Sequence, residues 1–368
     1  MLAFRTAIQP MNPYIPGRSV DEVRKLYQLD EIIKLASNEN PNGCSPAVRE
    51  AFLQGLQNLQ TFAEVAVYPD GYCTQLRKAV SKHYNIEGER LIFGAGTDEV
   101  IAMLGKIFIE PGDECITGAI TFSQYAAATE SMGGKMVYAP MKNHGFDLEA
   151  LLQCITPKTK MIFIANPNNP TGTYFSKDEQ TVFMKQVPKN IVVVFDEAYQ
   201  EYVTASNYPD TWETLRQFPS NVVLLKTFSK IYGLASFRIG FGAACPSIIE
   251  QMEKIRCPFN VTAQAQTAAC AALADQNFVQ ESYKQNQQVM TYMVQSLEKM
   301  GLYCIPSQAN FIMVDVKRDS REVFETLMKK GYIIRPGAAF GMDDFIRITV
   351  GTQKQAEGLL EALKKAIE

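Results

Sequence analysis

The sequence predicts an α/β fold with a mainly parallel sheet, divided into two domains. Strand-like apolar runs alternate with runs of helical spacing from about residue 91 to about residue 242, which is the pattern of consecutive β–α–β units. Some of the apolar runs are unbroken, as at residues 191–195, and strands buried on both faces are typical of parallel sheets. The 368 residues are too many for one small core and therefore indicate two domains.

Composition and charge exclude several classes of protein. The chain is 46% hydrophobic and 20% charged, as in ordinary globular proteins, and its formal net charge of -3 gives no basic surface for nucleic acid. No apolar run approaches the length of a membrane span, and the first residues lack the apolar segment of a signal peptide. We therefore expect a cytoplasmic protein that contacts neither nucleic acid nor membrane.

Cysteine and histidine usage argues against disulfides and metal sites. The eight cysteines are scattered without a Cys-x-x-Cys pair, which indicates reduced thiols that serve mainly in packing. The two histidines, His83 and His144, have no neighbours at metal-ligand spacing. We expect no bound metal, and a Ser-His-Asp hydrolase would depend on one of these two residues.

A candidate phosphate site follows the first strand-like run, residues 90–93. The turn Gly94-Ala95-Gly96-Thr97 comes next, and the apolar residues after it have helical spacing: Val100, Ile101, Met103, Leu104, Ile107 and Phe108. Gly96 and Thr97 therefore open a helix, whose free N–H groups and dipole favour a phosphate. A plain capped turn is the alternative.

Two further strand ends carry polar side chains. Residues 160–165 lead into a rigid turn, Asn166-Pro167-Asn168-Asn169-Pro170-Thr171-Gly172, which can hold an asparagine side chain against a ligand. Residues 190–195 lead into Asp196-Glu197-Ala198-Tyr199. Carboxyl ends of strands in open α/β sheets present ligand groups, so Asp196 is well placed to meet a protonated ring nitrogen and Tyr199 a ring hydroxyl. A helix N-cap is the alternative role of Asp196.

The most informative segment surrounds Lys230. An apolar run at residues 222–225 leads into it, the hydroxyls of Thr227 and Ser229 precede it, and Arg238 follows eight residues later. A lysine that leaves water can lose its proton and become a nucleophile, whereas hydroxyls and a guanidinium suit a bound phosphate. This combination predicts a lysine that forms a Schiff base with pyridoxal 5'-phosphate (PLP). A surface lysine beside a helix cap is the alternative.

These four segments resemble those of fold-type I PLP-dependent aminotransferases. The resemblance extends along nearly the whole chain through further segments: Asn12-Pro13-Tyr14-Ile15-Pro16-Gly17, Ser37-Asn38-Glu39-Asn40-Pro41, Tyr68-Pro69-Asp70-Gly71, Arg256-Cys257-Pro258-Phe259-Asn260-Val261, Ala309-Asn310-Phe311, Ile334-Arg335-Pro336-Gly337 and Ile346-Arg347-Ile348-Thr349-Val350-Gly351-Thr352. This set is similar to the histidinol-phosphate aminotransferases in particular.

The resemblance implies a three-layer α/β/α large domain with a mainly parallel sheet and a smaller α+β domain. Residues 1–40 would form an N-terminal arm that is part of the small domain and its lid. Residues 41–275 would form the PLP-binding domain, and residues 276–368 the small C-terminal domain. It also implies a homodimer with shared active sites.

The resemblance further assigns roles at the cofactor. Lys230 would hold PLP and act as the catalytic base, Asp196 would bond the ring nitrogen, and Tyr199 and Asn169 the ring oxygen. The remaining positions match residues that bind the phosphate or the ring: Gly96, Thr97, Thr227, Ser229 and Arg238 for the phosphate, Phe122 stacked on the ring, and Tyr68 reaching the phosphate of the neighbouring subunit. Phe122 could equally be a core residue and Tyr68 a surface turn.

At the substrate, the resemblance points to Arg335, Arg347 and Tyr14, with Asn38 or Asn40 in the lid. A guanidinium fork accepts either carboxylate or phosphate, so these arginines suit both histidinol phosphate and the pair glutamate and 2-oxoglutarate. A surface ion pair is the alternative for Arg335.

The implied activity is therefore conversion of L-histidinol phosphate and 2-oxoglutarate to imidazole acetol phosphate and L-glutamate, a step of histidine biosynthesis. Three alternatives on the same fold stay open. They are an aromatic amino-acid aminotransferase, a decarboxylase of a phosphorylated amino acid, and a PLP-sensing regulator, although Tyr14 comes too early to leave room for the DNA-binding module that such regulators carry.

Overall fold

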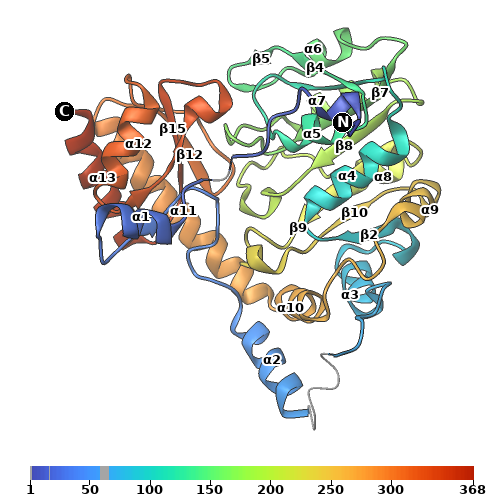
Figure 1. Cartoon of the computed structure of the whole chain (residues 1–368), viewed down its shortest axis with the longest axis horizontal. Helices are drawn as coiled ribbons and strands as arrows, with labels where there is room; N and C mark the ends of the chain where they lie inside the picture. The colour runs from blue at the N-terminus through green and yellow to red at the C-terminus, as the bar shows by residue number, and fades with distance from the viewer. Residues whose placement is uncertain (1, 16, 59–65) are drawn as a thin grey trace.

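The computed structural model of the chain describes residues 2–15, 17–58 and 66–368, so Pro16 of the N-terminal motif lies outside the described residues. The chain forms two lobes, each built on its own sheet (Figure 1). In the described part of the chain, no helix has both the length and the apolar character needed to cross a membrane.

The large lobe contains a seven-stranded sheet in the order β2-β10-β9-β8-β7-β3-β4. Strand β10 is antiparallel to both of its neighbours, and the other pairs are parallel. The mainly parallel sheet predicted from the sequence is confirmed. The strands are β2 (Leu91–Gly94), β3 (Glu114–Gly118), β4 (Lys135–Ala139), β7 (Thr159–Ala165), β8 (Val192–Asp196), β9 (Val222–Thr227) and β10 (Gly240–Ala243).

Helices cover both faces of this sheet because its central strands are apolar on both sides. Val193 of β8 faces one hydrophobic cluster and Val194 faces the other. The first face is covered by α3 (Thr74–Tyr84), α6 (Leu148–Gln153), α7 (Lys177–Gln186), α8 (Thr211–Gln217) and α10 (Ala263–Ala274), and the second by α4 (Thr97–Phe108), α5 (Gln124–Glu130) and α9 (Pro246–Ile255). Helix α2 (Pro46–Asn58) packs on α10 (Figure 1). This is the expected three-layer arrangement.

The small lobe is an antiparallel four-stranded sheet with helices packed on it. Its elements are β11 (Tyr303–Cys304), β12 (Phe311–Asp315), β14 (Arg335–Pro336) and β15 (Phe345–Thr349), with α11 (Gln276–Lys299), α12 (Ser320–Met328) and α13 (Gln353–Ile367). The N-terminal segment joins this lobe. Strand β1 (Ile33–Lys34) pairs in parallel with β13 (Tyr332–Ile333), and α1 (Val20–Tyr27) packs through Val23 in one cluster with Met328.

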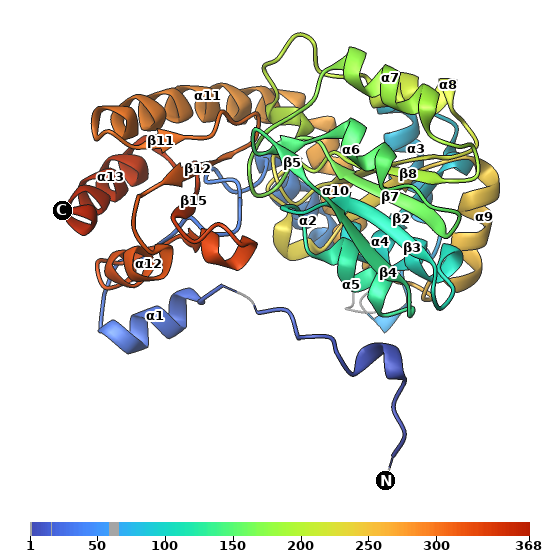
Figure 2. The same ribbon diagram turned by 90° about the horizontal axis from the view of Figure 1, so that it is seen from above.

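Helix α11 connects the two lobes (Figures 1 and 2). It begins at the N-cap Asp275, whose side chain accepts a hydrogen bond from the Phe278 amide. Val279 packs in the core of the large lobe and Val289 in that of the small lobe, so the passage between cores occurs within the helix. We propose a domain boundary at residue 275, where the connecting helix starts, with the first turns of the helix still packed on the core of the large lobe.

The first residues of the chain run away from the small lobe, to which α1 belongs (Figure 2). Residues 2–15 contain one short 3-10 helix, η1 (Thr6–Ile8), and extend along the large lobe (Figure 2). Leu2, Phe4 and Ile15 of this segment are exposed. A hairpin of β5 (Met141–Lys142) and β6 (Gly145–Phe146) completes the set of strands.

Candidate active site

The site lies where three parallel strands of the large sheet end beside the small lobe. Strand β8 ends at Asp196, β9 ends at Thr227, and β7 runs into the turn that holds Asn169. The pairing register sets Asp196 opposite Ala165 on one side and Leu225 on the other. The three polar strand ends therefore meet at one edge, the edge at which open α/β sheets present ligand groups.

Lys230 points from its loop toward the N-terminal segment. Its Nζ donates a hydrogen bond to the Ser37 carbonyl at 3.0 Å and lies 5.6 Å from the centre of the Tyr199 ring. The residue is half-buried. Among the ion pairs of the described residues, none involves Lys230. Its amine is thus held by a neutral carbonyl next to the proposed ring-oxygen ligand.

Asp196 is a buried carboxylate in which only one of the two oxygens accepts a hydrogen bond from the described residues. It is 5% exposed, and its Oδ2 accepts a 2.8 Å hydrogen bond from the Tyr125 hydroxyl. Its Oδ1 is buried and has no partner within residues 2–15, 17–58 and 66–368. Burial raises the pKa of Asp196 to about 6, and the Tyr125 hydrogen bond opposes that rise. A buried acceptor without a donor is costly, so Oδ1 fits a ligand that brings a cationic N–H.

Tyr125 is a residue of the site that the sequence analysis missed. It lies on α5, is fully buried, and stacks on Phe163 with 4.9 Å between ring centres. Phe122 meets its edge at 5.6 Å, which places Phe122 near Asp196 as well. Burial raises the pKa of Tyr125 well above its usual value, so the hydroxyl remains a donor. The signal in the sequence was its position three residues after Phe122, in the first turn of α5.

The proposed phosphate ligands gather where α4 begins. Gly96 has φ of 79°, and a Cβ there would lie 2.7 Å from Arg238 Nη2. A Cβ at Gly240 would lie 2.8 Å from the Thr97 amide, and Gly240 pairs with Thr227 across β9 and β10. The close packing of Gly96, Thr97, Thr227 and Arg238 therefore requires glycine at two positions.

Two details of this cradle differ from the simplest expectation. The Gly96 amide donates to the Gly94 carbonyl at 2.7 Å, so the unpaired donors at this end belong to the first turn of α4. Arg238 forms an exposed ion pair with Asp98 at 3.2 Å. The Ser229 amide donates to Thr227 Oγ1 at 3.1 Å, which fixes the two hydroxyl residues relative to each other.

A buried cluster of charges lies on the face of β9 opposite to Thr227, around Lys226. Lys226 Nζ is 2.9 Å from a Glu201 carboxylate oxygen and 3.8 Å from one of Glu197. Burial raises the pKa of Glu197 to about 7, and Lys226 opposes that rise. This cluster fastens the segment after Asp196 to the strand that leads to Lys230.

Asn38 and Asn40 make different contacts. Asn38 Nδ2 donates to the Tyr199 hydroxyl at 3.0 Å, while Thr349 Oγ1 donates to Asn38 Oδ1 at 3.0 Å. Asn38 thus joins the site to the small lobe. Thr349 lies in the segment at residues 346–352 that resembles the family, but no local pattern predicts this contact.

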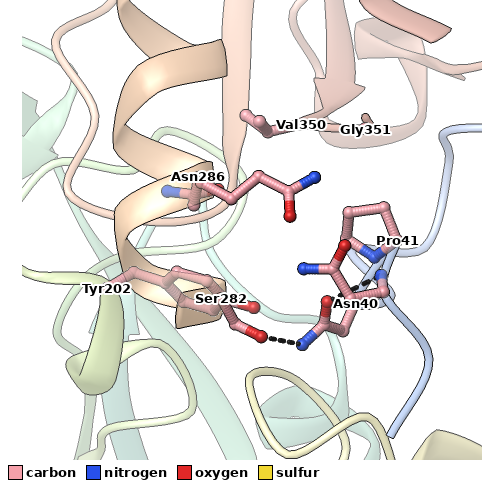
Figure 3. Close-up of a pocket in the computed structure, with 9 residues that line it drawn as sticks. Asn40, Pro41, Tyr202, Ser282, Asn286, Val350 and Gly351 are labelled. Carbon is pink, nitrogen blue, oxygen red and sulfur yellow. Dashed lines mark hydrogen bonds between the residues drawn. The ribbon is translucent and has the colours of Figure 1, made fainter. Parts of the chain in front are cut away.

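Asn40 faces the connecting helix. Its Nδ2 donates to the Ile231 carbonyl at 2.7 Å and to Ser282 Oγ at 3.1 Å. Figure 3 shows this contact beside a small polar pocket that Tyr202 and Asn286 also line. Asn40 therefore holds the loop after Lys230 against α11.

Arg347 enters the site from the small lobe and contacts Asn169. Its Nη1 donates to Asn169 Oδ1, and its Nη2 donates to the Ala36 carbonyl at 2.7 Å. The residue is 6% exposed. Burial lowers the pKa of Arg347 to about 10; Tyr199 opposes the shift and Arg335 adds to it. The arginine predicted for substrate and the asparagine predicted for cofactor are therefore adjacent.

Arg335 lies beside Arg347, whereas Tyr14 and Tyr68 are largely exposed. Arg335 is half-buried, and its Nη2 donates to the Ile15 carbonyl at 3.3 Å. Tyr14 is 63% exposed and is near enough to Arg347 to raise the pKa of that arginine slightly against the effect of burial. Tyr68 is 79% exposed and stacks on Phe259 with 4.5 Å between ring centres. The single chain does not bring Tyr68 into contact with the other site residues.

The described residues contain no group of three or more side chains that could hold a metal ion. The donor set instead fits PLP: an unpartnered carboxylate oxygen for the ring nitrogen, an amine nearby, and a glycine cradle with a helix start and an arginine for the phosphate.

Comparison with known proteins agrees with this geometry. Residues 30–363 match the family of class I and II aminotransferases. The chain is 44% identical to the histidinol-phosphate aminotransferase of Moorella thermoacetica, over 99% of this chain and 92% of that protein. It is 43% identical to the one of Geobacillus sp., over 100% and 99%.

A solved structure is similar across the whole fold. The histidinol-phosphate aminotransferase of Sinorhizobium meliloti, in complex with pyridoxal-5'-phosphate, superimposes with a TM-score of 0.89 at 26% identity, covering 99% of this chain and 97% of that one. Matched in family, in full-length relatives and in fold, this chain belongs to the histidinol-phosphate aminotransferase family of the class I and II aminotransferases.

Proposed function

We propose that this protein transfers an amino group from L-histidinol phosphate to 2-oxoglutarate, with PLP as cofactor, yielding imidazole acetol phosphate and L-glutamate. The observation that carries the proposal is the position of Arg335 and Arg347 beside the Lys230 and Asp196 edge of the large sheet. Two guanidinium groups at one site suit substrates that bear a phosphate or two carboxylates.

The residues of the chain divide the cofactor work between them. PLP, when bound, supplies the electron sink that makes the substrate C–H bond acidic. Asp196 Oδ1 accepts the ring N–H and keeps that nitrogen charged. Tyr199 and Asn169 bond the ring oxygen, and Phe122 lies against the ring. Thr97, Thr227, Ser229 and Arg238 would hold the phosphate, and Gly96 leaves room for the Arg238 guanidinium.

Lys230 has two tasks in this proposal. Its Nζ would hold the cofactor in the resting enzyme, and its amine would act as the base for the proton on the substrate carbon that bears the amino group. Among the described residues, Nζ donates one hydrogen bond, to the neutral Ser37 carbonyl.

Substrate selection falls to residues from both ends of the chain. Arg347 binds a carboxylate of glutamate or 2-oxoglutarate, while Arg335 and Tyr14 bind the phosphate of histidinol phosphate. Asn38 donates a hydrogen bond to the Tyr199 hydroxyl and thus connects the N-terminal segment to the cofactor side of the site. One pocket thus accepts two unlike substrates because a guanidinium pairs with either anion.

We further propose a homodimer with shared active sites. Tyr68 and Phe259 stack on each other while both are exposed, and Val67 and Tyr72 in the same stretch of chain as Tyr68 are exposed as well. Exposed apolar groups that lie together commonly mark interfaces. In a dimer Tyr68 would reach the phosphate in the neighbouring subunit. We place the enzyme in the cytoplasm, where its eight thiols would stay reduced.

Steady-state kinetics test the proposal. With 2-oxoglutarate as acceptor, kcat/KM for histidinol phosphate should exceed that for phenylalanine. A preference for phenylalanine would assign the aromatic amino-acid activity instead. Release of CO2 from threonine phosphate without glutamate formation would assign the decarboxylase.

A further inference from the structure

Arg335 and Arg347 form a pair of like charges without a counter-charge. They lie directly opposite each other on β14 and β15, and neither takes part in an ion pair within the part of the chain that is described. Arg347 is also buried, and its Nε has no partner among these residues. Such an arrangement needs some other source of negative potential while no anionic ligand is bound.

One aromatic ring faces both arginines. The guanidinium carbon of Arg347 lies 5.2 Å from the centre of the Phe340 ring, and that of Arg335 lies 6.0 Å from it. Both distances fall within the range in which the negative face of a ring attracts a cation. Phe311 approaches Arg347 alone, at 5.4 Å, so Phe340 is the ring that the two guanidinium groups share.

The backbone holds Phe340 firmly in this position. It ends η6 (Gly337–Phe340), which follows directly on Arg335 and Pro336. A Cβ at Gly337 would lie 2.3 Å from the Phe345 carbonyl oxygen, and Met342 donates its amide to the Gly337 carbonyl at 3.0 Å. The tight turn therefore fixes the backbone from which the ring projects toward the arginines.

The two arginines depend on this ring to different degrees. Arg347 is fixed by Asn169 and by the Ala36 carbonyl. Within residues 2–15, 17–58 and 66–368, Arg335 has one hydrogen bond, of 3.3 Å to the Ile15 carbonyl, and it is half-buried. Without the ring, repulsion from Arg347 would favour rotamers of Arg335 that point to solvent.

We propose that Phe340 is a specificity-determining residue that positions Arg335 beside Arg347 for the anionic group of the substrate. The inference rests on the proposed function, because it assumes that a phosphate binds at these arginines. Loss of the ring would reduce the fraction of molecules that are ready to bind, and affinity falls in proportion to that fraction. The expected loss is roughly five- to thirtyfold, which corresponds to about 1–2 kcal/mol of cation–π attraction.

The test is a calorimetric titration of the PLP-bound enzyme with inorganic phosphate. Phe340→Leu should weaken phosphate binding by about five- to thirtyfold, whereas Phe340→Tyr, which keeps the ring, should stay within about twofold of wild type. Phe324→Leu is the matched control, since Phe324 packs against the small-lobe clusters and is not among the rings that face the two arginines in the described residues. Phe340→Met serves as a second aliphatic variant if the leucine variant does not fold.

Three results would overturn the inference: wild-type affinity in the aliphatic variants, an equal loss in Phe340→Tyr, or no phosphate binding by wild type. Unchanged absorbance of bound PLP and an unchanged melting temperature establish that each variant is intact. Turnover of histidinol phosphate by wild type is measured separately. If wild type turns over histidinol phosphate but the Phe340 variants bind phosphate as tightly as wild type, only this inference is contradicted. If wild type does not turn over histidinol phosphate, the proposed function is contradicted.

Discussion

Tyr125 donates a 2.8 Å hydrogen bond to one oxygen of Asp196 and leaves the other oxygen without a partner in the described chain. The bond is made between a helix and a strand end that are 71 residues apart in sequence. It orients the carboxylate so that its open oxygen can meet a ring nitrogen, and it stabilises the charged form.

We expect Tyr125→Phe to keep the stacking on Phe163 and to lose this orientation. Because the hydrogen bond lowers the pKa of Asp196, its removal should raise that pKa. The acid limb of the kcat profile should move to higher pH, and kcat should fall about tenfold, as for loss of one hydrogen bond to a charged group. Tyr138→Phe, at an exposed tyrosine, is the control. Identical pH profiles for Tyr125→Phe and wild type would show that the bond does not act on Asp196.

Lys230→Ala should still bind PLP but should lose transamination by several orders of magnitude, since both the attachment point and the proton carrier are removed. Borohydride treatment of the wild type should fix the cofactor to the peptide that contains Lys230, as peptide mass mapping would detect. Modification of another lysine, such as the buried Lys226, would contradict the assignment.

Asp196 should make the stability of the cofactor-free protein depend on pH. Burial raises its pKa to about 6 in the folded state, above the value near 3.9 of an unfolded chain. Between these two values the folded state binds more protons, so the free energy of unfolding should fall as the pH rises toward 6 and remain lower above it.

Urea unfolding of the cofactor-free protein at pH 5 and pH 7.5 measures this effect. Asp196→Asn carries no titrating group, so it should gain stability relative to wild type at the higher pH. Glu197 titrates in a similar range but is present in both proteins, so its contribution cancels. The same stability difference at both pH values would contradict the raised pKa. With PLP added, Asp196→Asn should lose turnover far more than cofactor affinity.

Local sequence patterns were enough to predict where several candidate site residues lie in the fold. Asp196 and Lys230 end or follow apolar strands, and Gly96 and Thr97 open a helix, so the sheet edge that collects them could be expected. Contacts between segments that are distant in sequence could not be predicted in this way. The bond from Asn38 to Tyr199 spans 161 residues and that from Arg347 to Asn169 spans 178, and no periodicity encodes such pairings.

Other differences have physical causes as well. The Gly96 amide was expected at the phosphate, but it closes a tight turn onto Gly94. The passage between cores lies inside α11 because that helix carries apolar residues for both lobes along one continuous length. Tyr68 was predicted to serve a neighbouring subunit, and its exposure in the single chain leaves that prediction to be tested.

The last prediction concerns the preference for a phosphorylated substrate. Arg335→Ala should damage turnover of histidinol phosphate much more than turnover of phenylalanine, because only the first presents a dianionic phosphate to the guanidinium. Loss of one charge-assisted hydrogen bond costs roughly 1.5–3 kcal/mol, which is about ten- to a hundredfold in kcat/KM. Arg321→Ala is the control, since Arg321 is exposed and pairs with Asp319 and Asp343.

The ratio of the two kcat/KM values is the decisive quantity. Arg347 keeps its own contacts to Asn169 and Ala36, so the acceptor half-reaction with 2-oxoglutarate should be affected less than the half-reaction with histidinol phosphate. Single-turnover measurements of each half-reaction separate the two. An equal fall with both amino donors would mean that Arg335 supports the shared acceptor site or the β14–β15 pair, and the phosphate would then have to be assigned to Tyr14 and Arg347.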